Sequence, residues 1–308
     1  MKILDWEAVH AQAARTDLAT VLQAAFANPA EAPPRTQHAV APGGTLLIMP
    51  AWRSASRTGV KLVTVFPQNT RQGLPSVMAQ YMLLSGETGE PQALIDGQAL
   101  TLVRTAAVSA FAARLLSPSP KAGILVVGAG ALAPYLARAH CAAQAPQELM
   151  VWARDPVKCA SVADELSNEG LPARAVRDLQ AAARSADLVC TATFATSPLI
   201  RGAWLKPGCH LDLVGSFQPA MREADEVAVA RAQVTVDDSA ALREAGELVH
   251  ALATGSIGEA DIADLTAALC GEPRPIRGDI TVFKSIGAAL ADLAVAEALV
   301  DLPPLDGN

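Results

Sequence analysis

The sequence lacks an excess of positive charge. Its 308 residues include 24 Lys and Arg against 31 Asp and Glu, which gives a formal net charge of −7 at pH 7. Nucleic acids and anionic membrane surfaces bind proteins that cluster Lys and Arg. We therefore expect neither as a main partner, and small metabolites are the natural ligands of such a chain.

Patterned cysteine and histidine are also missing. The five cysteines have no C-x-x-C motif and no regular spacing, which argues against a disulfide framework and against a zinc site. The five histidines show no paired metal-binding spacing, so we expect no metal. The chain contains neither the G-x-S-x-G motif of a serine nucleophile nor a Cys–His nucleophile signature.

Long apolar runs are absent as well. The first ten residues include Asp5 and Glu7 and lack the apolar core of about 7–15 residues that a signal peptide needs. No run approaches the roughly 18 apolar residues of a membrane span. We therefore expect a cytoplasmic protein that does not enter a membrane.

What the chain does have is the composition of a globular protein, with 51% apolar and 18% charged residues. Its length suffices for two domains that each bury a core. Helical periodicity in residues 5–28 is followed by a Pro-rich linker at 29–34. The next region is β-rich, with turn residues between apolar runs. We expect strands at 45–49, 59–66 and 77–84, a hairpin over 83–95, and a helix at 101–116.

From residue 121 onward, strands and helices alternate. The expected strands lie at 124–127, 148–152, 173–176, 187–193, 210–216 and 233–237, with a helix at 156–168. This alternation predicts an α/β fold, a Rossmann-type doubly wound parallel sheet. After it we expect helices at 239–253 and 259–269, a short strand near Ile280 and a closing helix at 285–300.

The closing helix is apolar on several faces, which predicts that it packs against the first region of the chain. We therefore expect a discontinuous domain made of residues 1–116 and 281–308. The dinucleotide-binding domain, residues 117–280, is then inserted within it.

Residues 124–127 lead into a nucleotide-binding motif. These four apolar residues are typical of a parallel strand that is buried on both faces. Gly128, Gly130 and Ala133 then match G-x-G-x-x-G/A, which provides a tight turn, close approach to a pyrophosphate and close helix packing. The helix expected at about 131–143 directs free N–H groups at the phosphates. The residues expected to bind the dinucleotide are Gly128, Gly130, Ala131, Leu132 and Ala133.

The tip of the second strand indicates which dinucleotide. NAD-selective folds carry an acid about 20 residues past the glycines, and NADP-selective folds carry a nearby Arg. Counting on from Ala133 leads to Ala153, which is followed by Arg154, and Lys158 adds a second positive charge. We expect both to bind the 2′-phosphate of NADPH. NADH remains open, because Asp155 serves the ribose if the strand is one residue longer.

Three basic residues precede the glycine motif. Arg35 follows two prolines, Lys61 lies inside an otherwise apolar strand, and Arg104 lies in a helix of small residues. A solvated face is the ordinary reading of a strand Lys. Few residues near Arg104 in the sequence are polar. A guanidinium among such residues favours a planar carboxylate, which it binds with two parallel hydrogen bonds.

An ordered set of segments resembles the ornithine cyclodeaminase/μ-crystallin family. The segments are GVKLVTVFPQN, GLPSV, ETGEPQALIDGQALTLVRTAA, VVGAGALA, LVGSFQPAMREAD and TVFKSIGAAL, and they span nearly the whole chain. The resemblance implies a Rossmann domain inserted into a second domain that binds substrate and forms a homodimer. It also implies that Arg35, Lys61 and Arg104 bind the substrate carboxylate. It places Ser76, Thr105, Thr191 and Ser285 near the cofactor or the substrate, and we expect Thr193 and Val214 to contact the cofactor.

One position departs from the cyclodeaminase pattern. Cyclodeaminases of this family carry a catalytic Asp two residues after the glycine that ends the fifth strand, and here Phe217 stands at that place. A phenyl ring neither accepts a proton nor holds an ammonium group. The segment resembles instead the branch that reduces cyclic imines, where an apolar ring suits the substrate skeleton. Packing at the mouth of the sheet is the other reading of Phe217.

These features predict an NAD(P)H-dependent oxidoreductase. The expected reaction is reduction of Δ1-pyrroline-2-carboxylate to L-proline, and of Δ1-piperideine-2-carboxylate to L-pipecolate. Either Lys61 or an ordered water donates the proton to the imine. The alternatives are an ornithine cyclodeaminase, an alanine dehydrogenase, and a nucleotide-bound protein without turnover. Glu223 and Asp225 are expected to anchor their loop by binding N–H groups at a helix start.

Overall fold

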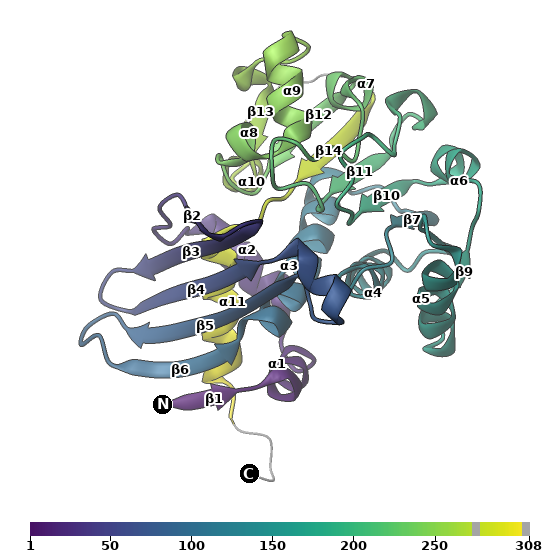
Figure 1. Cartoon of the computed structure of the whole chain (residues 1–308). Helices are drawn as coiled ribbons and strands as arrows, with labels where there is room; N and C mark the ends of the chain where they lie inside the picture. The colour runs from purple at the N-terminus through teal and green to yellow at the C-terminus, as the bar shows by residue number, and fades with distance from the viewer. Residues whose placement is uncertain (273–277, 304–308) are drawn as a thin grey trace. The chain divides into compact units, whose positions relative to one another are not determined.

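The computed structural model describes residues 1–272 and 278–303 (Figure 1). It divides into two compact units along the chain. Unit 1 comprises Met1–Thr105 and Ala288–Asn308, and unit 2 comprises Ala106–Gly287. The boundary between them falls inside one helix, α3 (Gly97–Leu116).

Unit 1 is built on a six-stranded sheet in the order β1-β6-β5-β4-β3-β2. Strand β1 pairs with β6 in parallel, and every other pair is antiparallel. In chain order the elements are β1 (Lys2–Leu4), α1 (Trp6–Ala13), α2 (Leu18–Ala27), β2 (Thr36–Ala41), β3 (Gly44–Arg53), β4 (Arg57–Val65), the 3-10 helix η1 (Pro67–Gln72), β5 (Val77–Ser85), β6 (Pro91–Asp96), the first part of α3, and α11 (Ala289–Asp301).

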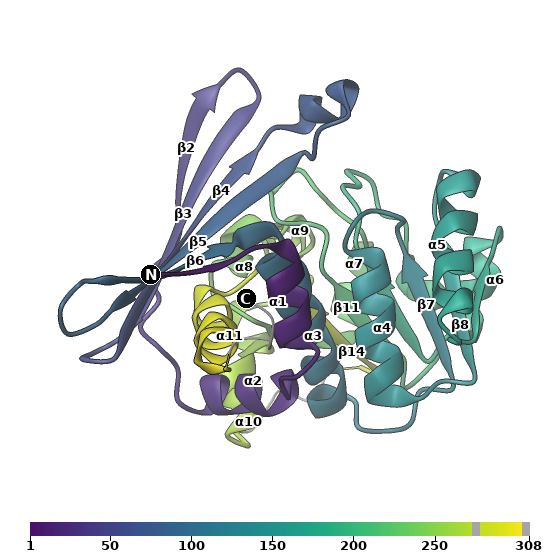
Figure 2. The ribbon, with the colours of Figure 1, turned by 90° about the horizontal axis from the view of Figure 1, so that it is seen from below.

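Helices cover one face of this sheet. Helix α11 packs on β3, β4 and β5, α2 packs on α11, and α1 packs on β6. Figure 2 shows α1, α2 and α11 on the same side of the sheet. The prediction that the closing helix packs against the first region is therefore confirmed. The opposite face, which we call the open face, exposes Leu62, Met78 and Met82 by 45%, 38% and 36%.

Unit 2 is built on an eight-stranded sheet in the order β13-β12-β14-β11-β10-β7-β8-β9, in which all pairs are parallel. Its strands are β7 (Gly123–Val127), β8 (Glu148–Trp152), β9 (Ala173–Ala175), β10 (Leu188–Thr191), β11 (His210–Leu213), β12 (Ala232–Val236), β13 (Ile262–Asp264) and β14 (Ile280–Lys284). Its helices after α3 are α4 (Ala133–Gln144), α5 (Pro156–Asn168), α6 (Leu179–Ser185), η2 (Gly202–Trp204), α7 (Glu226–Ala230), α8 (Ala241–Glu244), α9 (Gly246–Thr254), η3 (Glu259–Asp261) and α10 (Leu265–Leu269).

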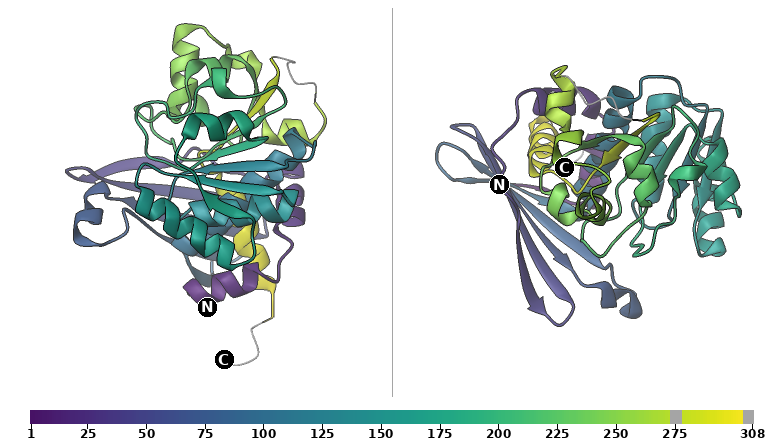
Figure 3. Two further views of the ribbon diagram at one scale, coloured as in Figure 1. Left: turned by 90° about the vertical axis from the view of Figure 1, so that its right-hand side faces the viewer. Right: turned by 90° about the horizontal axis from the view of Figure 1, so that it is seen from above.

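The sheet of unit 2 is covered on both faces. One core cluster includes Leu125 and Val127, and the other includes Ile124 and Val126, so successive residues of β7 point into different cores. All four are fully buried, which explains the continuous apolar run in the sequence. Figure 3 shows helices on the two sides of the sheet. The predicted Rossmann-type fold is confirmed.

The unit boundaries differ from those expected. The sequence analysis ended the inserted domain at residue 280, but β14 (Ile280–Lys284) pairs with β11 and β12 inside the parallel sheet. It placed the other boundary at 116, but Ala106 and Ala113 of α3 already pack in a core cluster of unit 2. A short strand that returns from a distant part of the chain leaves no local signal of which sheet it joins.

Several elements also differ from expectation. The single helix expected at 5–28 is two helices, because Asp5 and Asp17 each cap the start of a new one. Strands β1, β2 and β13 and helix α6 were not expected. Strands β1 and β13 have three residues each and α6 has seven, while β2 is exposed along its whole length and lacks an apolar alternation. The helix expected at 259–269 instead contains β13 between η3 and α10.

Helix α3 is long and apolar enough to cross a membrane by length and composition alone, with a mean hydropathy of 1.4 over its best window. Of that window, 67% is buried inside the protein, as in the core helix of a globular fold. Among the described residues it is the one helix that meets these criteria.

Candidate active site

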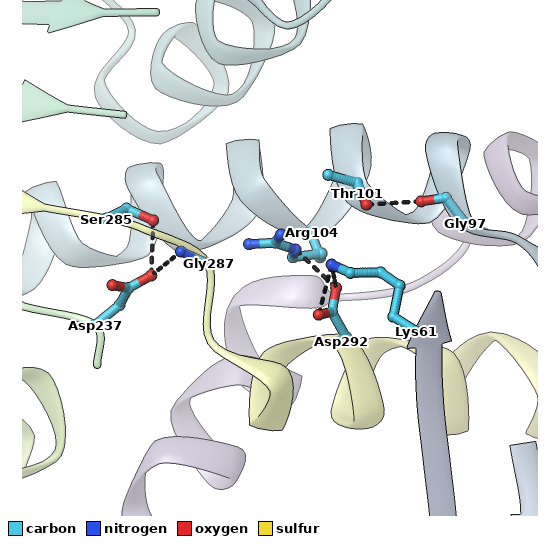
Figure 4. Close-up of polar contacts among 8 residues, drawn as sticks. All are labelled: Lys61, Gly97, Thr101, Arg104, Asp237, Ser285, Gly287 and Asp292. Atoms are coloured by element: carbon cyan, nitrogen blue, oxygen red, sulfur yellow. Dashed lines mark hydrogen bonds and ion pairs between the residues drawn. The ribbon is translucent and has the colours of Figure 1, made fainter. Parts of the chain in front are cut away.

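A buried ion cluster in unit 1 joins two of the three basic residues singled out in the sequence. Lys61 lies on β4, points to the helix-covered face and is 1% exposed. Its Nζ donates to both carboxylate oxygens of Asp292 on α11, at 2.8 and 2.7 Å. Arg104 on α3 donates from Nε to Oδ1 of Asp292 at 2.8 Å. Figure 4 shows the ammonium and the guanidinium meeting at this carboxylate.

Arg104 keeps part of its guanidinium uncommitted. The side chain is buried, and Nη1 has no hydrogen-bond partner among the described residues. A buried N–H without a partner costs free energy, which a ligand acceptor recovers. The cluster is thus suited to bind a carboxylate.

The electrostatics of Lys61 suit proton transfer. The pKa of Lys61 is lowered from 10.5 to about 8. Burial is the largest cause, the charge of Arg104 is the next, Asp292 opposes both, and Arg35 contributes a smaller decrease. The ammonium is therefore the main form at neutral pH and can still release a proton at modest cost. Arg35, the third basic residue, is partly buried before β2, and its charge acts on Lys61.

Asp292 was missed by the sequence analysis, which considered only the apolar residues of the closing helix. A signal was available, because Asp292 is an acid among Ala and Leu in the segment GAALADLAVA. Two cations buried in one core require a counter-ion. Which acid serves as this counter-ion could not be predicted from the sequence, because Asp292 is 231 residues from Lys61 and 188 from Arg104 along the chain.

The glycine loop of unit 2 has the geometry that a pyrophosphate needs. Gly128 has a φ of +133°, and a Cβ there would lie 2.6 Å from the carbonyl oxygen of Ala192. Around Gly130, a Cβ would meet nothing within 4 Å, so this side of the loop is open. Ala133 is fully buried at the start of α4. Because α4 begins at Ala133 rather than at 131, Ala131 and Leu132 belong to the loop.

The N-terminus of α4 has no side-chain cap, which leaves its N–H groups able to bind an anion. Leu132 occupies the N-cap position and makes no side-chain hydrogen bond to the helix. By contrast, Asp155, Asp178 and Asp225 cap α5, α6 and α7 of the same unit. The first N–H groups of α4 therefore have no side-chain cap, as expected where phosphates bind.

After the carboxyl end of β8, two basic side chains are exposed, and the carboxylate of Asp155 is hydrogen-bonded to the start of α5. Arg154 and Lys158 are both exposed. The Oδ1 of Asp155 accepts from the N–H groups of Val157 and Lys158, at 3.0 and 3.2 Å. Asp155 is thus used as the cap of α5. The alternative interpretation, in which Asp155 binds the ribose of NADH, fits this arrangement less well.

The other expected cofactor residues are distributed over both units. Thr191 and Val214 lie buried at the carboxyl ends of β10 and β11. Thr193 and Ser285 have their hydroxyls engaged within unit 2, Thr193 to Glu223 at 2.8 Å and Ser285 to Asp237 at 2.7 Å. Figure 4 shows Asp237 also accepting from the N–H of Gly287.

Two expected cofactor residues belong to unit 1. Thr105 is buried in α3, next to Arg104. Ser76 is partly buried, and its carbonyl accepts from the N–H of Phe66 at 2.7 Å. The assignment of Ser76 and Thr105 to cofactor contacts stays a prediction.

Phe217 forms an aromatic pair that the sequence analysis did not foresee. Its ring meets Phe194 edge to face, with 6.1 Å between centroids and an interplanar angle of 78°. Phe194 follows β10 and is 60% exposed. No short-range pattern links the two residues. The pair puts two apolar rings at the position where the resemblance implies a carboxylate in cyclodeaminases.

Two buried acids hold the loop that carries Phe217. Glu223 accepts from the N–H groups of Thr193 and Gly215, at 2.6 and 2.7 Å, and burial raises its pKa. Glu247 on α9 accepts from the N–H of Glu223 at 2.5 Å and from the hydroxyl of Ser216. Glu223 therefore anchors strand ends, and not the helix start that was expected.

The second loop acid behaves as expected. Asp225 accepts from the N–H of Ala228 at 3.0 Å and so caps α7. It also accepts from the N–H of Gly202 at 2.8 Å, which ties η2 to this helix start.

A polar cluster in the core of unit 2 also went unpredicted. Asp212 accepts from His140 at 3.0 Å and from the thiol of Cys190 at 3.1 Å, and all three side chains are fully buried. Burial alone raises the pKa of Asp212, but the hydrogen bond and charge of His140 bring it below its usual value. The ligand atoms lie within 4.8 Å of one another, a spacing that a metal ion could use. Both hydrogen bonds go to Oδ2 of Asp212, while Oδ1 of Asp212 and Nδ1 of His140 are buried without a partner among the described residues.

The parallel sheet, the glycine loop and the uncapped α4 define a Rossmann-type dinucleotide-binding protein. The sequence profile of the ornithine cyclodeaminase/mu-crystallin family matches residues 2–302. The chain belongs to this family, as the resemblance implied.

Two relatives show the similarity in sequence. The chain is 40% identical over 276 residues to the protein SAR DEFICIENT 4 of Arabidopsis thaliana, covering 86% of this chain and 85% of that one. It is 34% identical over 313 residues to the Δ1-pyrroline-2-carboxylate reductase of Colwellia psychrerythraea, covering 98% and 99%.

Two solved structures show the similarity in fold. The Δ1-pyrroline-2-carboxylate reductase of Thermococcus litoralis, in complex with NADH and L-proline, matches with a TM-score of 0.92 and 29% identity over 98% of this chain and 97% of that one. An archaeal alanine dehydrogenase dimer with bound NAD matches with a TM-score of 0.89 and 27% identity, over 98% and 95%.

We predict that Gly130→Ala weakens dinucleotide binding without unfolding the protein. The added methyl group meets no atom of the chain, so the free energy of unfolding should change by less than about 0.5 kcal/mol. It would occupy the open side of the loop and raise the Kd for NADPH at least about tenfold. Calorimetric titration with NADPH measures this effect.

Gly123→Ala on the adjacent strand is the matched control, because its Cβ would make only ordinary contacts, at 3.8 Å. It should leave the Kd unchanged. Equal NADPH affinity in Gly130→Ala and wild type would mean that the pyrophosphate does not lie against this loop.

Proposed function

We propose that this protein reduces Δ1-pyrroline-2-carboxylate to L-proline with NADPH or NADH, and Δ1-piperideine-2-carboxylate to L-pipecolate. The observation that carries the proposal is the buried cluster of Lys61, Arg104 and Asp292, which offers both a carboxylate site and a proton donor. A relative 34% identical over nearly the whole chain bears the name of this reductase. The similar fold of the T. litoralis reductase with NADH and L-proline supports the same reaction.

In this proposal the side chains of unit 1 hold and protonate the substrate. Nη1 of Arg104, which has no partner among the described residues, binds the substrate carboxylate together with Arg35, whose charge also acts on Lys61. Lys61 donates a proton to the imine nitrogen, which makes the carbon a better hydride acceptor. NADPH or NADH, when bound, supplies the hydride. The C=N double bond becomes a single bond, and the nitrogen keeps the proton from Lys61.

The side chains of unit 2 fit the cofactor. The open side of Gly130 and the uncapped start of α4 suit the pyrophosphate. Arg154 and Lys158 favour the 2′-phosphate of NADPH, because Asp155 is engaged as a helix cap. The bound NADH and NAD of the two solved structures keep NADH as a second donor.

Phe217 separates this proposal from the cyclodeaminase alternative. The Phe194–Phe217 pair supplies no group that binds an ammonium or accepts a proton. An apolar wall suits the ring carbons of a cyclic imine.

We further propose that the protein is a homodimer and resides in the cytoplasm. The open face of the unit 1 sheet exposes the apolar side chains of Leu62, Met78 and Met82, which a second copy of the chain would cover. The similar alanine dehydrogenase is a dimer. Sedimentation equilibrium tests the state, and a monomer at micromolar concentration would reject the dimer.

The direct test of the reaction follows NADPH oxidation with each cyclic imine, and ammonia release from ornithine with NAD. Imine-dependent oxidation supports the proposal. Ammonia release without imine reduction would indicate the cyclodeaminase, and oxidation with pyruvate and ammonia alone would indicate an alanine dehydrogenase. Silence in all assays would indicate a binding protein.

Arg104→Leu should raise the KM for the imine by about 10- to 100-fold, because a hydrogen bond to a charged group contributes about 1.5–3 kcal/mol. Steady-state kinetics with saturating NADPH measure it. Arg114→Leu, on the same helix but exposed, is the control and should leave KM unchanged. An unchanged KM in Arg104→Leu would remove this residue from the substrate site.

The rate should depend on the protonation of Lys61. Because Lys61 donates a proton, only its ammonium form is active, and the rate should fall as pH rises through about 8. A pH profile of kcat/KM between 6 and 10, which reports the groups of the free enzyme, shows the decline. A profile that stays flat to pH 10, or Lys61→Met with wild-type kcat, would assign the proton to another donor.

A further inference from the structure

We propose that Asp292 is a positioning residue of this site, which holds Lys61 in its charged form and sets which edge of Arg104 faces the substrate. The inference rests on the proposed function, because Asp292 acts through the two residues that bind and protonate the imine. It assigns a role to an acid that the sequence analysis did not single out.

The geometry leaves Asp292 no direct part in the reaction. Its side chain is buried, and both oxygens accept hydrogen bonds from cations, at 2.7 and 2.8 Å from Lys61 and at 2.8 Å from Arg104. A carboxylate bound to two cations is a poor proton donor and a poor base. Its effect therefore passes through its two partners.

The charges around Lys61 make Asp292 decisive. Two positive charges act on Lys61, that of Arg104 on α3 and that of Arg35 in the segment before β2. Both disfavour the ammonium form of Lys61. Tyr81 lies opposite Lys61 on β5, with a buried hydroxyl whose own pKa is raised by burial and by the charges of Asp292 and Glu297. Among the described groups that act on Lys61, Asp292 is the one that favours its charged form.

The same carboxylate orients Arg104. A guanidinium can offer a carboxylate either its Nε side or its outer Nη edge. Because Nε is bound to Asp292, the outer edge remains, and Nη1 on that edge is the buried atom without a partner among the described residues. Asp292 thus determines that the outer Nη edge of Arg104 contacts the substrate carboxylate.

The first test measures the charge of Lys61 without using activity. The chain has six lysines, so protein labelled with 13C at lysine Cε gives few NMR signals, and Lys61→Arg identifies the one from Lys61. In the wild type this signal should titrate near pH 8. In Asp292→Asn its midpoint should fall by about 1 unit or more, since loss of an adjacent opposite charge has this effect.

Asp301→Asn is the matched control, because Asp301 lies on the same helix in an exposed pair with Arg57. It should leave the midpoint in place. An unchanged midpoint in Asp292→Asn would overturn the inference. If Asp292→Asn does not fold, Asp292→Glu is titrated instead. It keeps the charge and should hold the midpoint near the wild-type value, and a midpoint lowered by more than about 1 unit would overturn the inference.

The second test uses kinetics. Asp292→Asn should lower kcat/KM at least about threefold at pH 7.5, because a midpoint lowered from about 8 by about 1 unit leaves about a third as much ammonium form. It should also shift the decline of kcat/KM to lower pH and raise the KM for the imine, while Asp301→Asn changes none of these. Asp292→Glu should restore the pH profile, because it restores the charge. Wild-type enzyme that reduces no imine would reject the proposed function. Reduction with a normal pH profile in Asp292→Asn would reject only the role of Asp292.

Discussion

The ion cluster around Asp292 is the constraint on which the organisation of unit 1 depends. Two cations are removed from water in one core, and each is stable there only because the same carboxylate binds it. The three partners come from β4, α3 and α11, so the cluster also ties the last helix of the chain to the sheet formed near its beginning. One guanidinium nitrogen of Arg104 remains without a partner among the described residues, which fits the carboxylate binding proposed for this cluster.

Unit 2 uses buried acids in a related way. Glu223 and Glu247 hold the ends of β10 and β11 and the loop that carries Phe217, and Asp237 binds the turn that follows β14. A buried carboxylate that accepts two or three N–H bonds fixes backbone which has no regular hydrogen bonds of its own. The carboxyl edge of a parallel sheet, where ligands bind in this fold, consists of such backbone. The backbone at this edge is thus held by buried acids whose oxygens accept hydrogen bonds from within the chain.

The sequence revealed what is encoded locally. The buried run of β7 and the glycines after it specify a strand, a turn and an open loop within a dozen residues, and the structure has them nearly where they were expected. Lys61 and Arg104 stood out because charge is rare in apolar segments. Asp292, the Glu223 anchor and the Phe194–Phe217 pair depend on contacts between elements far apart in the chain, which no periodicity encodes. Strand β14 shows the same limit, since its partners β11 and β12 are chosen by the fold and not by its five residues.

The most direct test of the central claim follows the transferred hydrogen. Δ1-pyrroline-2-carboxylate is incubated with the protein and NADPH that carries two deuterium atoms at C4, and the proline formed is analysed by mass spectrometry and NMR. The account predicts L-proline with one deuterium at the α-carbon, formed in step with NADPH oxidation. Unlabelled proline, or oxidation of NADPH without proline, would contradict it.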